Sequence, residues 1–386
     1  MRFAIFISVV VGIITAIHYF FWVRIVRDTN IPTPYRQSAT WTLVGLAASL
    51  PLGVILGRVL PPSMRGTISW PVFIWMGVMF ILLVLLIGAE FVRLPLWNWG
   101  RLFGGVPLHP ERRQFFARLL GGSAGALSGG IGSYAVYQAI ASLHVRRVEV
   151  KLDRLPAAAR GTSIVQITDL HLGSMIGRAY CQEVVDRINA LEPDIIAITG
   201  DLVDGSVEEL RDAASPLGLL KARHGVFFVT GNHEYYSGAD PWVAELQRIG
   251  IRVLRNEHVL IGDGPEDPNG FILAGVDDYA AFGNGHGPDM QRALHGRPAD
   301  SAVVLLAHQP RHVHEAEKLG VDLQISGHTH GGQIWPFHLI VRMVQPFVAG
   351  LGRKGKTQIY VSHGTGYWGP PLRLGTQAEI THLTLV

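Results

Sequence analysis

Long apolar stretches near the N-terminus constrain this chain more than any other feature of its sequence. Segments at about 3–23, 40–60 and 70–92 each approach the roughly 20 apolar residues that an α-helix needs to cross a bilayer. Buried helices of soluble domains are shorter and carry more charge. The charged fraction of the whole chain, 16%, is also below the roughly 25% usual in soluble domains. The sequence therefore predicts transmembrane helices rather than a wholly soluble or disordered chain.

A fourth stretch, at about 117–143, is less apolar and is rich in Gly and Ala. It carries glycines at four-residue spacing, Gly121, Gly125 and Gly129, a pattern that allows helices to pack closely in membranes. We expect this stretch to form a fourth span. Residues 1–147 are then an N-terminal α-helical transmembrane region of about four spans.

The charge differs between the two parts of the chain. Residues 1–145 hold eleven Arg, no Lys and three acidic residues, whereas the remainder has a net charge of −5. The Arg residues cluster at the ends of the apolar stretches, where they influence membrane topology, and no nucleic-acid partner is expected. The single cysteine, Cys181, excludes an intramolecular disulfide and CxxC motifs. The oligomeric state is left open.

Two cues bear on the orientation of the chain in the membrane. The loops after the first and third predicted spans carry eight Arg residues, and the opposite side of the membrane carries seven basic residues. This difference barely decides the orientation. The fourth stretch is preceded by Arg112-Arg113-Gln114-Phe115-Phe116, which resembles a bacterial twin-arginine export signal. An ordinary juxtamembrane Arg pair explains this segment equally well. Both cues favour a multi-pass protein of the bacterial cell membrane with its C-terminal part on the extracytoplasmic side.

The pattern changes at about residue 148, where short β-branched stretches begin to alternate with amphipathic ones. Helices are predicted at 178–191 and 207–220. Strands are predicted at 163–168, 195–199, 226–230, 271–276, 302–307, 322–326, 357–362 and 379–386. Such alternation is typical of α/β domains. Residues 148–386 are therefore predicted to form an α/β domain.

Polar side chains follow five of these strands at the point where each strand ends. The segments are Asp169-Leu170-His171, Gly200-Asp201-Leu202-Val203-Asp204, Gly231-Asn232-His233-Glu234, Ala307-His308 and Gly327-His328-Thr329-His330. Sites in open α/β sheets form beyond the carboxyl ends of the strands, so we expect these side chains to meet at one rim. Carboxylate and imidazole together suit divalent ions such as Mn, Fe or Zn. Any one of these histidines alone is better explained as an ordinary polar loop residue.

The ordered set resembles the calcineurin-like metallophosphoesterases, whose pattern is Asp-x-His, Gly-Asp-x-x-Asp, Gly-Asn-His-Glu, a later His and Gly-His-x-His. The resemblance covers about residues 160–386. The segments 331–336, 348–351 and 364–371 are similar to the bacterial membrane-attached or exported branch of that family. The resemblance implies a two-sheet α/β sandwich flanked by helices, with two divalent metal ions.

The resemblance also implies a role for each motif residue. Seven residues are implied metal ligands: Asp169, His171, Asp201, Asn232, His308, His328 and His330. Asp201 is implied to bridge the ions, with Asp169, His171 and His330 on the first. His233 is implied to be catalytic without ligating metal, and Asp204 and Glu234 to orient the ligands and His233. A hydroxide that bridges the metals would attack phosphorus in line.

Weaker signals lie outside these motifs. Asp277 and Asp278 are interpreted as a solvated strand end, and His312 as a surface residue at a helix start. His363 has no assigned role. The run Arg353–Lys356 fits the attraction of an anionic headgroup and a solvated charge run equally well. Four aromatic residues could form an apolar rim above the metals, but the favoured interpretation is that they pack in the interior. These residues are Trp335, Phe337, Tyr367 and Trp368.

The sequence as a whole predicts a membrane-anchored phosphoesterase that acts on phosphodiesters, with a lipid-linked or envelope substrate and the lipid bilayer as its partners. One alternative is a cytoplasmic-facing nucleotide-lipid pyrophosphatase, which needs the opposite topology. Another is a non-catalytic membrane module with a structural metal site. His233 argues against the latter, because a structural site needs no histidine that is not a ligand.

Overall fold

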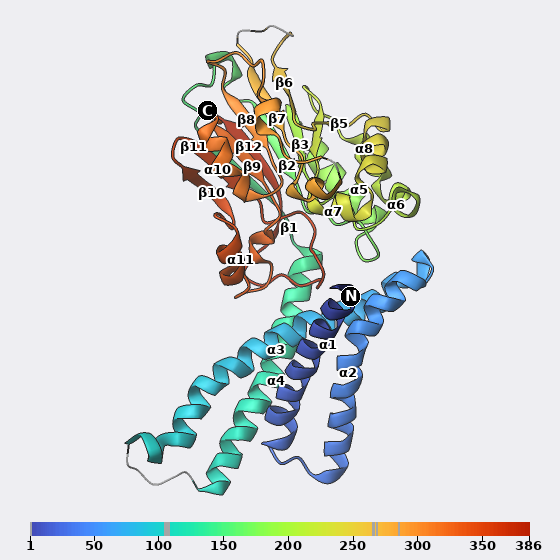
Figure 1. Cartoon of the computed structure of the whole chain (residues 1–386), viewed down its shortest axis with the longest axis vertical. Coiled ribbons are helices and arrows are strands. Elements are labelled where there is room, and N and C mark those ends of the chain that lie inside the picture. The colour runs from blue at the N-terminus through green and yellow to red at the C-terminus, as the bar shows by residue number, and fades with distance from the viewer. Residues whose placement is uncertain (1, 104–108, 265–266, 268, 285) are drawn as a thin grey trace. The chain divides into compact units, whose positions relative to one another are not determined.

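The computed structural model describes residues 2–103, 109–264, 267, 269–284 and 286–386. The chain divides into two compact units, residues 1–137 with 369–372, and residues 138–368 with 373–386. The first unit is helical and the second contains all the strands that the described residues form (Figure 1).

The helical unit contains α1 (Arg2–Phe21), the π-helical turn η1 (Trp22–Arg27), α2 (Thr33–Val59) and α3 (Pro62–Phe103), and most of α4 (Pro110–Ala141). Three segments of the described residues are long and apolar enough to cross a membrane: Ile7–Arg27, Thr33–Gly57 and Met64–Pro95. The predicted fourth stretch is helical, as part of α4, but is not among them. Its Gly, Ala and Ser residues lower its hydropathy, so the expectation of about four spans is not confirmed.

Charged side chains in the helical unit pair with one another. Glu90 lies 2.7 Å from Arg24 and 2.6 Å from Arg93, and Arg24 also lies 2.7 Å from Asp28. All four side chains are less than one-fifth exposed. Charges removed from water are tolerated when they are paired in this way, so these helices can carry them next to apolar segments.

The second unit is built on two six-stranded mixed sheets. The first sheet has the order β1 (Leu143–Val150), β12 (Ala378–Leu385), β2 (Ser163–Ile167), β3 (Ile195–Thr199), β4 (Val226–Val229) and β5 (Arg252–Val253). The second has the order β10 (Gly350–Lys354), β11 (Thr357–Val361), β9 (Leu323–Ser326), β8 (Val303–Leu306), β7 (Phe271–Gly275) and β6 (Glu257–Ile261). Strands β2 to β5 are parallel, as are β7, β8, β9 and β11.

The two sheets face each other across a shared core. Residues of the first sheet such as Ile164 and Phe227 belong to one buried cluster with Leu273 and Ile325 of the second sheet. The outer face of the first sheet is covered by α5 (Arg178–Asn189), α6 (Val207–Ala214) and α8 (Ala239–Arg248). The outer face of the second is covered by α9 (Met290–Ala293) and α10 (Val313–Lys318). The expected two-sheet sandwich flanked by helices is confirmed.

The strands that the sequence did not predict are the four edge strands, β1, β5, β6 and β10. Central strands such as β3 are buried throughout and are therefore apolar along their length. Edge strands are half exposed and carry charges that discourage pairing with other chains. Thus β1 contains the exposed pair Arg146 and Arg147, and β10 ends in Arg353 and Lys354. Their sequences lack the apolar pattern that identified the others.

Candidate metal centre

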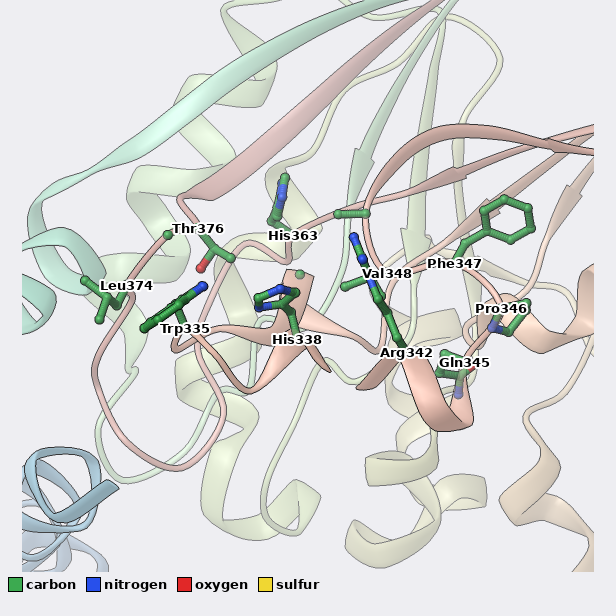
Figure 2. Close-up of a pocket in the computed structure, with 13 residues that line it drawn as sticks. Trp335, His338, Arg342, Gln345, Pro346, Phe347, Val348, His363, Leu374 and Thr376 are labelled. Atoms are coloured by element: carbon green, nitrogen blue, oxygen red, sulfur yellow. The ribbon is translucent and has the colours of Figure 1, made fainter. Parts of the chain in front are cut away.

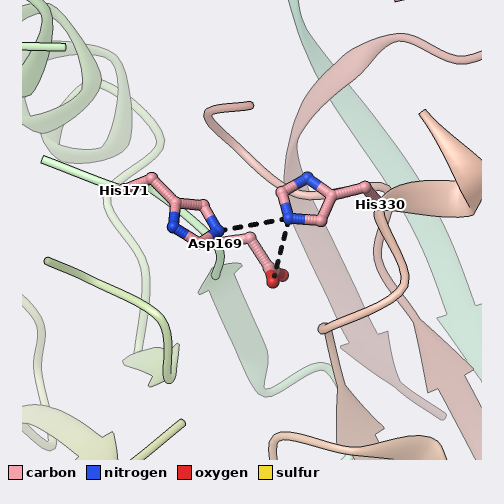
Figure 3. A group of neighbouring side chains, drawn as sticks. All are labelled: Asp169, His171 and His330. Atoms are coloured by element: carbon pink, nitrogen blue, oxygen red, sulfur yellow. Dashed lines mark hydrogen bonds and ion pairs between the residues drawn. The ribbon is translucent and has the colours of Figure 1, made fainter. Parts of the chain in front are cut away.

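The loops after β2 and β9 bring together a first group of possible metal ligands, Asp169, His171 and His330 (Figure 3). The Nε2 atoms of His171 and His330 are 3.2 Å apart, and His330 Nε2 lies 3.4 Å from an Asp169 carboxylate oxygen. All three residues are buried. Three possible ligand atoms from two loops therefore converge on one point.

A second group, Asp201, His308 and His328, comes from the loops after β3, β8 and β9. His308 Nε2 lies 3.1 Å from an Asp201 carboxylate oxygen and 3.2 Å from His328 Nδ1. The two groups are neighbours, because the backbone N–H of His328 donates to both carboxylate oxygens of Asp169 at 3.0 Å. The structure thus holds two adjacent sets of metal-ligating side chains.

The backbone at these residues is held in an unusual conformation. Positive φ angles between 50° and 71° occur at Asp169, His171, Asp201, His328 and His330. Non-glycine residues adopt this left-handed region rarely, at a cost of about 1–3 kcal/mol each, and such strain clusters at functional sites. The sharp turns at the strand ends aim consecutive side chains at one centre, and the surrounding core maintains them.

Two glycines are required by close packing around the carboxylates. A Cβ atom at Gly231 would collide with the carboxylate and backbone of Asp201, and one at Gly327 would collide with Thr168 and Asp169. The glycines in these motifs therefore allow neighbouring loops to approach the ligands within van der Waals distance.

His233 lies beside the first group without belonging to it. Its Nδ1 atom is 2.6 Å from Asp204 Oδ1, and the same oxygen lies 3.1 Å from His171 Nδ1. His233 Nε2 is 4.0 Å from Asp201 Oδ2, and its ring stands edge-on to that of His171. Asp204 thus orients two imidazoles at once and directs the other nitrogen of His233 toward the ligands.

Glu234 and Asn232 occupy the start of α7 (Asn232–Ser237). Glu234 is buried and accepts hydrogen bonds from the backbone N–H groups of Asp201, Leu202 and Gly231, so it fixes the Asp201 loop rather than a side chain. The Oδ1 atom of Asn232 is buried and has no hydrogen-bond partner among the described residues. A buried carbonyl oxygen without a donor is unusual and fits a metal ligand.

The pKa values of the candidate ligands shift in both directions. Burial lowers the pKa of His328 to about 3 and the pKa of His330 well below its ordinary value. Burial opposes ionisation of Asp201, but His308 outweighs it and lowers the pKa of that carboxyl group. Near neutral pH these three groups are in the forms that bind metal, neutral imidazole and carboxylate.

The other three candidates shift toward their protonated forms. Burial opposes protonation of His171 and His308, but Asp204 raises the pKa of His171 to about 9 and Asp201 raises the pKa of His308 well above its ordinary value. Burial raises the pKa of Asp169. Metal binding at this centre would therefore release protons.

The structure brings the ten predicted residues into neighbouring loops. Eight of them belong to groups whose atoms lie close enough to hold a metal ion, because His171, Asp204 and His233 form a third such group. Glu234 binds the backbone of the Asp201 loop, and Asn232 lies between Gly231 and His233 with its Oδ1 buried. Two other interpretations of the sequence were wrong. Asp277 and Asp278 are fully buried rather than solvated: Asp277 pairs with Arg255, and Asp278 accepts from Gln309. His312 is fully buried against the Tyr279 ring rather than on the surface.

The aromatic residues near the site are mostly exposed, contrary to expectation. Trp335 and Trp368 are more than half exposed and Phe337 is 39% exposed, whereas only Tyr367 is buried. The Trp368 ring lies 6.1 Å from that of His233. Packing therefore explains one of the four, and the other three leave apolar surface beside the metal centre.

The sequence missed two buried charged residues that support the site. Arg373 is fully buried and donates to the backbone carbonyls of His363, Gly364 and Gly366. Glu379 is buried and holds His363 Nδ1 at 2.9 Å. Neither Arg373 nor Glu379 belongs to a motif. The only signal in the sequence that could have indicated them is a charged residue within an otherwise apolar or glycine-rich segment.

Comparisons with known proteins agree with this geometry. A family model described as calcineurin-like phosphoesterase matches residues 162–332. The chain is 38% identical over 259 residues to a transmembrane protein with metallophosphoesterase domain from Danio rerio, covering 65% of this chain and 59% of that protein. A Bos taurus protein of the same name is 44% identical over 251 residues, covering 62% and 56%. This chain spans little more than half the length of these two relatives.

A bacterial relative is matched almost completely. The uncharacterized metallophosphoesterase YkuE of Bacillus subtilis is 32% identical over 286 residues, which cover 71% of this chain and 97% of that protein. This match covers nearly all of the Bacillus subtilis protein, and it agrees with the family model and with the geometry of the candidate ligands. The chain belongs to the calcineurin-like metallophosphoesterase family.

Proposed function

We propose that this protein is a membrane-anchored, dinuclear metal-dependent hydrolase of phosphoesters, with phosphodiesters as its main substrates. The observation that supports it most is the pair of adjacent ligand groups, linked by the hydrogen bonds from the His328 backbone to Asp169. Two cations side by side can stabilise both the attacking and the leaving oxygens when a phosphoester is hydrolysed.

The donor set fits two divalent ions. In this proposal Asp169, His171 and His330 hold one ion, and Asn232, His308 and His328 hold the other. Asp201 contributes to both. Bound Mn, Fe or Zn would neutralise the phosphoryl oxygens and lower the pKa of a water molecule enough to make it a nucleophile near neutral pH. The unpartnered Oδ1 of Asn232 is the strongest local support for the second ion.

The chain's own contribution to the reaction is proton transfer and orientation. Asp204 accepts a hydrogen bond from the Nδ1–H of His233, which leaves Nε2 facing the candidate ligands. As an imidazolium, protonated on both ring nitrogens, His233 is positioned to give its Nε2 proton to the leaving oxygen or to donate a hydrogen bond to it as negative charge develops. Burial opposes ionisation of Asp204, but His171 and His233 lower the pKa of its carboxyl group, so it stays ionised and keeps the imidazole oriented.

The apolar helices favour a substrate at the membrane surface, such as a lipid-linked phosphate or an envelope phosphodiester. We place the catalytic unit on the extracytoplasmic side of a bacterial cell membrane, supported by the Arg distribution and the Arg112-Arg113 segment. A reporter fused to the C-terminus, active only outside the cytoplasm, tests this. A cytoplasmic signal would favour the nucleotide-lipid pyrophosphatase.

The test of the activity is hydrolysis of bis(p-nitrophenyl) phosphate and p-nitrophenyl phosphate by the full chain in detergent. Protein stripped of metal is reloaded with Mn, Fe, Zn or Mg, next to Asp201→Ala, His233→Ala and the exposed control Arg252→Ala. We expect metal-dependent activity that both site variants lose and the control keeps, with the diester favoured. A folded protein that binds two ions and hydrolyses neither ester, nor any lipid ester, would favour the non-catalytic module.

A further inference from the structure

A cavity of about 730 Å³ adjoins the metal centre and plays no part in the chemistry above. Its walls come from α11 (His338–Val344), the segment that follows α11, and the loops that carry His363 and Thr376 (Figure 2). Gly331, which follows the ligand His330 directly, is also part of the wall. We call this cavity the α11 pocket. Its volume is that of a site for a small molecule or headgroup.

Three side chains in the α11 pocket can donate hydrogen bonds or carry positive charge. His338 and Arg342 project from α11, and His363 projects from another wall (Figure 2). Neither His338 nor Arg342 has a hydrogen-bond or ion-pair partner among the described residues, and α11 contains no acidic residue. An exposed guanidinium without a carboxylate is available to bind an anion in bidentate fashion.

His363 is fixed in place by Glu379. The buried Glu379 carboxylate lies 2.9 Å from His363 Nδ1 and also accepts from Tyr360. Burial opposes ionisation, but His363 outweighs it and lowers the pKa of Glu379 to about 2. A carboxylate on Nδ1 leaves Nε2 as the free nitrogen, and that edge of the ring lies close to Gly331, where a Cβ atom would collide with it. A histidine oriented by an ionised carboxylate therefore lines the pocket beside the metal ligands.

The same helix exposes apolar side chains to solvent. α11 has no buried residue, and Leu339, Ile340, Met343 and Val344 are each more than half exposed, with Met343 at 83%. Trp335, just before the helix, is 57% exposed. Contiguous apolar surface of this kind marks an interaction site. A short helix with exposed aliphatic residues and one arginine, preceded by an exposed tryptophan, has the composition of an element that lies in the membrane interface.

We propose that the α11 pocket binds the anionic headgroup of a phospholipid while α11 lies in the membrane interface. The assignment rests on the proposed phosphoesterase function and names its substrate class: an anionic lipid with its scissile phosphoester at the metal ligands. Arg342, His338 and His363 hold a second anionic group of the same headgroup. The acyl chains extend along the apolar side chains of α11.

A lipid fits this surface better than a protein partner does. The chain already carries three helices apolar enough to cross a membrane, so the catalytic unit is covalently attached to a membrane anchor. The cation of α11 complements the negative charge of anionic lipid surfaces. A pocket with donors at its wall and apolar side chains beside it matches an amphiphile, which has a charged head and apolar chains.

The first experiment measures whether α11 enters lipid. The chain has a single, buried cysteine, Cys181, whose thiol pKa is raised by burial to about 12, so it reacts poorly with labels. An environment-sensitive fluorophore is attached to Met343→Cys in the full chain, reconstituted in nanodiscs that contain acyl-chain quenchers. Leu219→Cys, on an exposed apolar residue of the same unit, is the control. We expect loss of fluorescence at position 343 and none at 219. Equal quenching, or none at either position, overturns the membrane contact.

The second experiment measures the headgroup site by calorimetry and does not depend on activity. The full chain in uncharged detergent is titrated with dihexanoyl phosphatidylserine, a phosphodiester whose headgroup carries a second anionic group, and with dihexanoyl phosphatidylcholine and inorganic phosphate. We expect phosphatidylserine to bind most tightly, and Arg342→Gln or His363→Gln to weaken its binding about ten-fold, the effect of one charge-assisted hydrogen bond. Arg252→Gln, an exposed arginine on β5, is the matched control.

The outcomes separate this inference from the proposed function. Phosphatidylserine binding that both pocket variants leave unchanged, or phosphatidylcholine or inorganic phosphate binding as tightly as phosphatidylserine, overturns the headgroup site. Each of these results leaves the hydrolysis of soluble diesters intact. Absence of hydrolysis with any ester, together with pocket-dependent phosphatidylserine binding, would instead refute the enzyme and retain a lipid-binding site.

Discussion

Substitution of Arg373 by Met tests whether a buried cation holds the metal-ligand loops together. The guanidinium is fully buried and donates to three backbone carbonyls in the segment 363–366. The same segment donates hydrogen bonds to the strand end that carries a ligand, from Thr365 to Thr168 and from Gly366 to Asp169. Met fills most of the volume but leaves the carbonyl oxygens of His363 and Gly366 without a donor, whereas that of Gly364 still accepts from the backbone N–H of Glu379.

The expected loss of stability follows from these contacts. A buried acceptor that loses its partner costs about 1–3 kcal/mol. Two such acceptors, at His363 and Gly366, put the expected loss at about 2–6 kcal/mol. For a unit of this size the melting temperature falls by about 2–4 °C per kcal/mol, so Arg373→Met should lower Tm by about 4–24 °C.

The assay is thermal unfolding of the full chain in detergent, monitored by tryptophan fluorescence. The metal affinity of unheated protein is a second, separate measurement. We expect metal binding to weaken about ten-fold, the usual effect of losing a residue that orients ligands. Exposed Arg252→Met is the control and should change stability by less than about 0.5 kcal/mol. A Tm for Arg373→Met equal to that of the control would refute the argument.

Three further predictions concern the site and its surroundings. Asp204→Asn should lower kcat for bis(p-nitrophenyl) phosphate about 10–100-fold, because His233 loses the carboxylate that orients it; exposed Asp263→Asn should not. Gly231→Ala should abolish binding of at least one metal ion in a metal-content assay, because the added Cβ collides with Asp201; Gly177→Ala, which has open space, is the control. Burial lowers the pKa of His312 to about 3, so between about pH 3 and 6.5 the unfolded chain binds a proton that the folded one excludes. Stability should therefore fall as the pH drops below 6.5, by about 2 kcal/mol at pH 5 from this residue. The loss between pH 7 and 5 should be smaller in His312→Leu, and an equal loss in both proteins would contradict the assignment.

Local sequence patterns were sufficient for much of the fold. The central strands could be recognised because burial on both faces forces an apolar run of β-branched residues, as in Ile195–Thr199. The three membrane-compatible helices could be recognised because length and lack of charge are properties of one segment. The edge strands could not, because their residues face both the core and water.

The sequence by itself determined which residues are candidate ligands. Each of the ten motif residues lies within a few residues of a strand end, and a parallel sheet brings strand ends to one edge. The ends of β2, β3 and β4 therefore meet at one edge of the first sheet, and those of β8 and β9 at one edge of the second. The identity of the candidate ligands is encoded locally, whereas the meeting of the two edges at one candidate metal centre depends on how the sheets pack.

Only the tertiary structure decided what surrounds that centre. The pairing of Glu379 with His363, the three carbonyls bound by Arg373, the burial of Asp278 and His312, and the pocket beside α11 all depend on segments that are distant in sequence or have no regular period. An exposed helix and a buried one can have the same apolar composition, as α11 demonstrates. Burial is a property of the assembled layers, so no local pattern could have distinguished these cases.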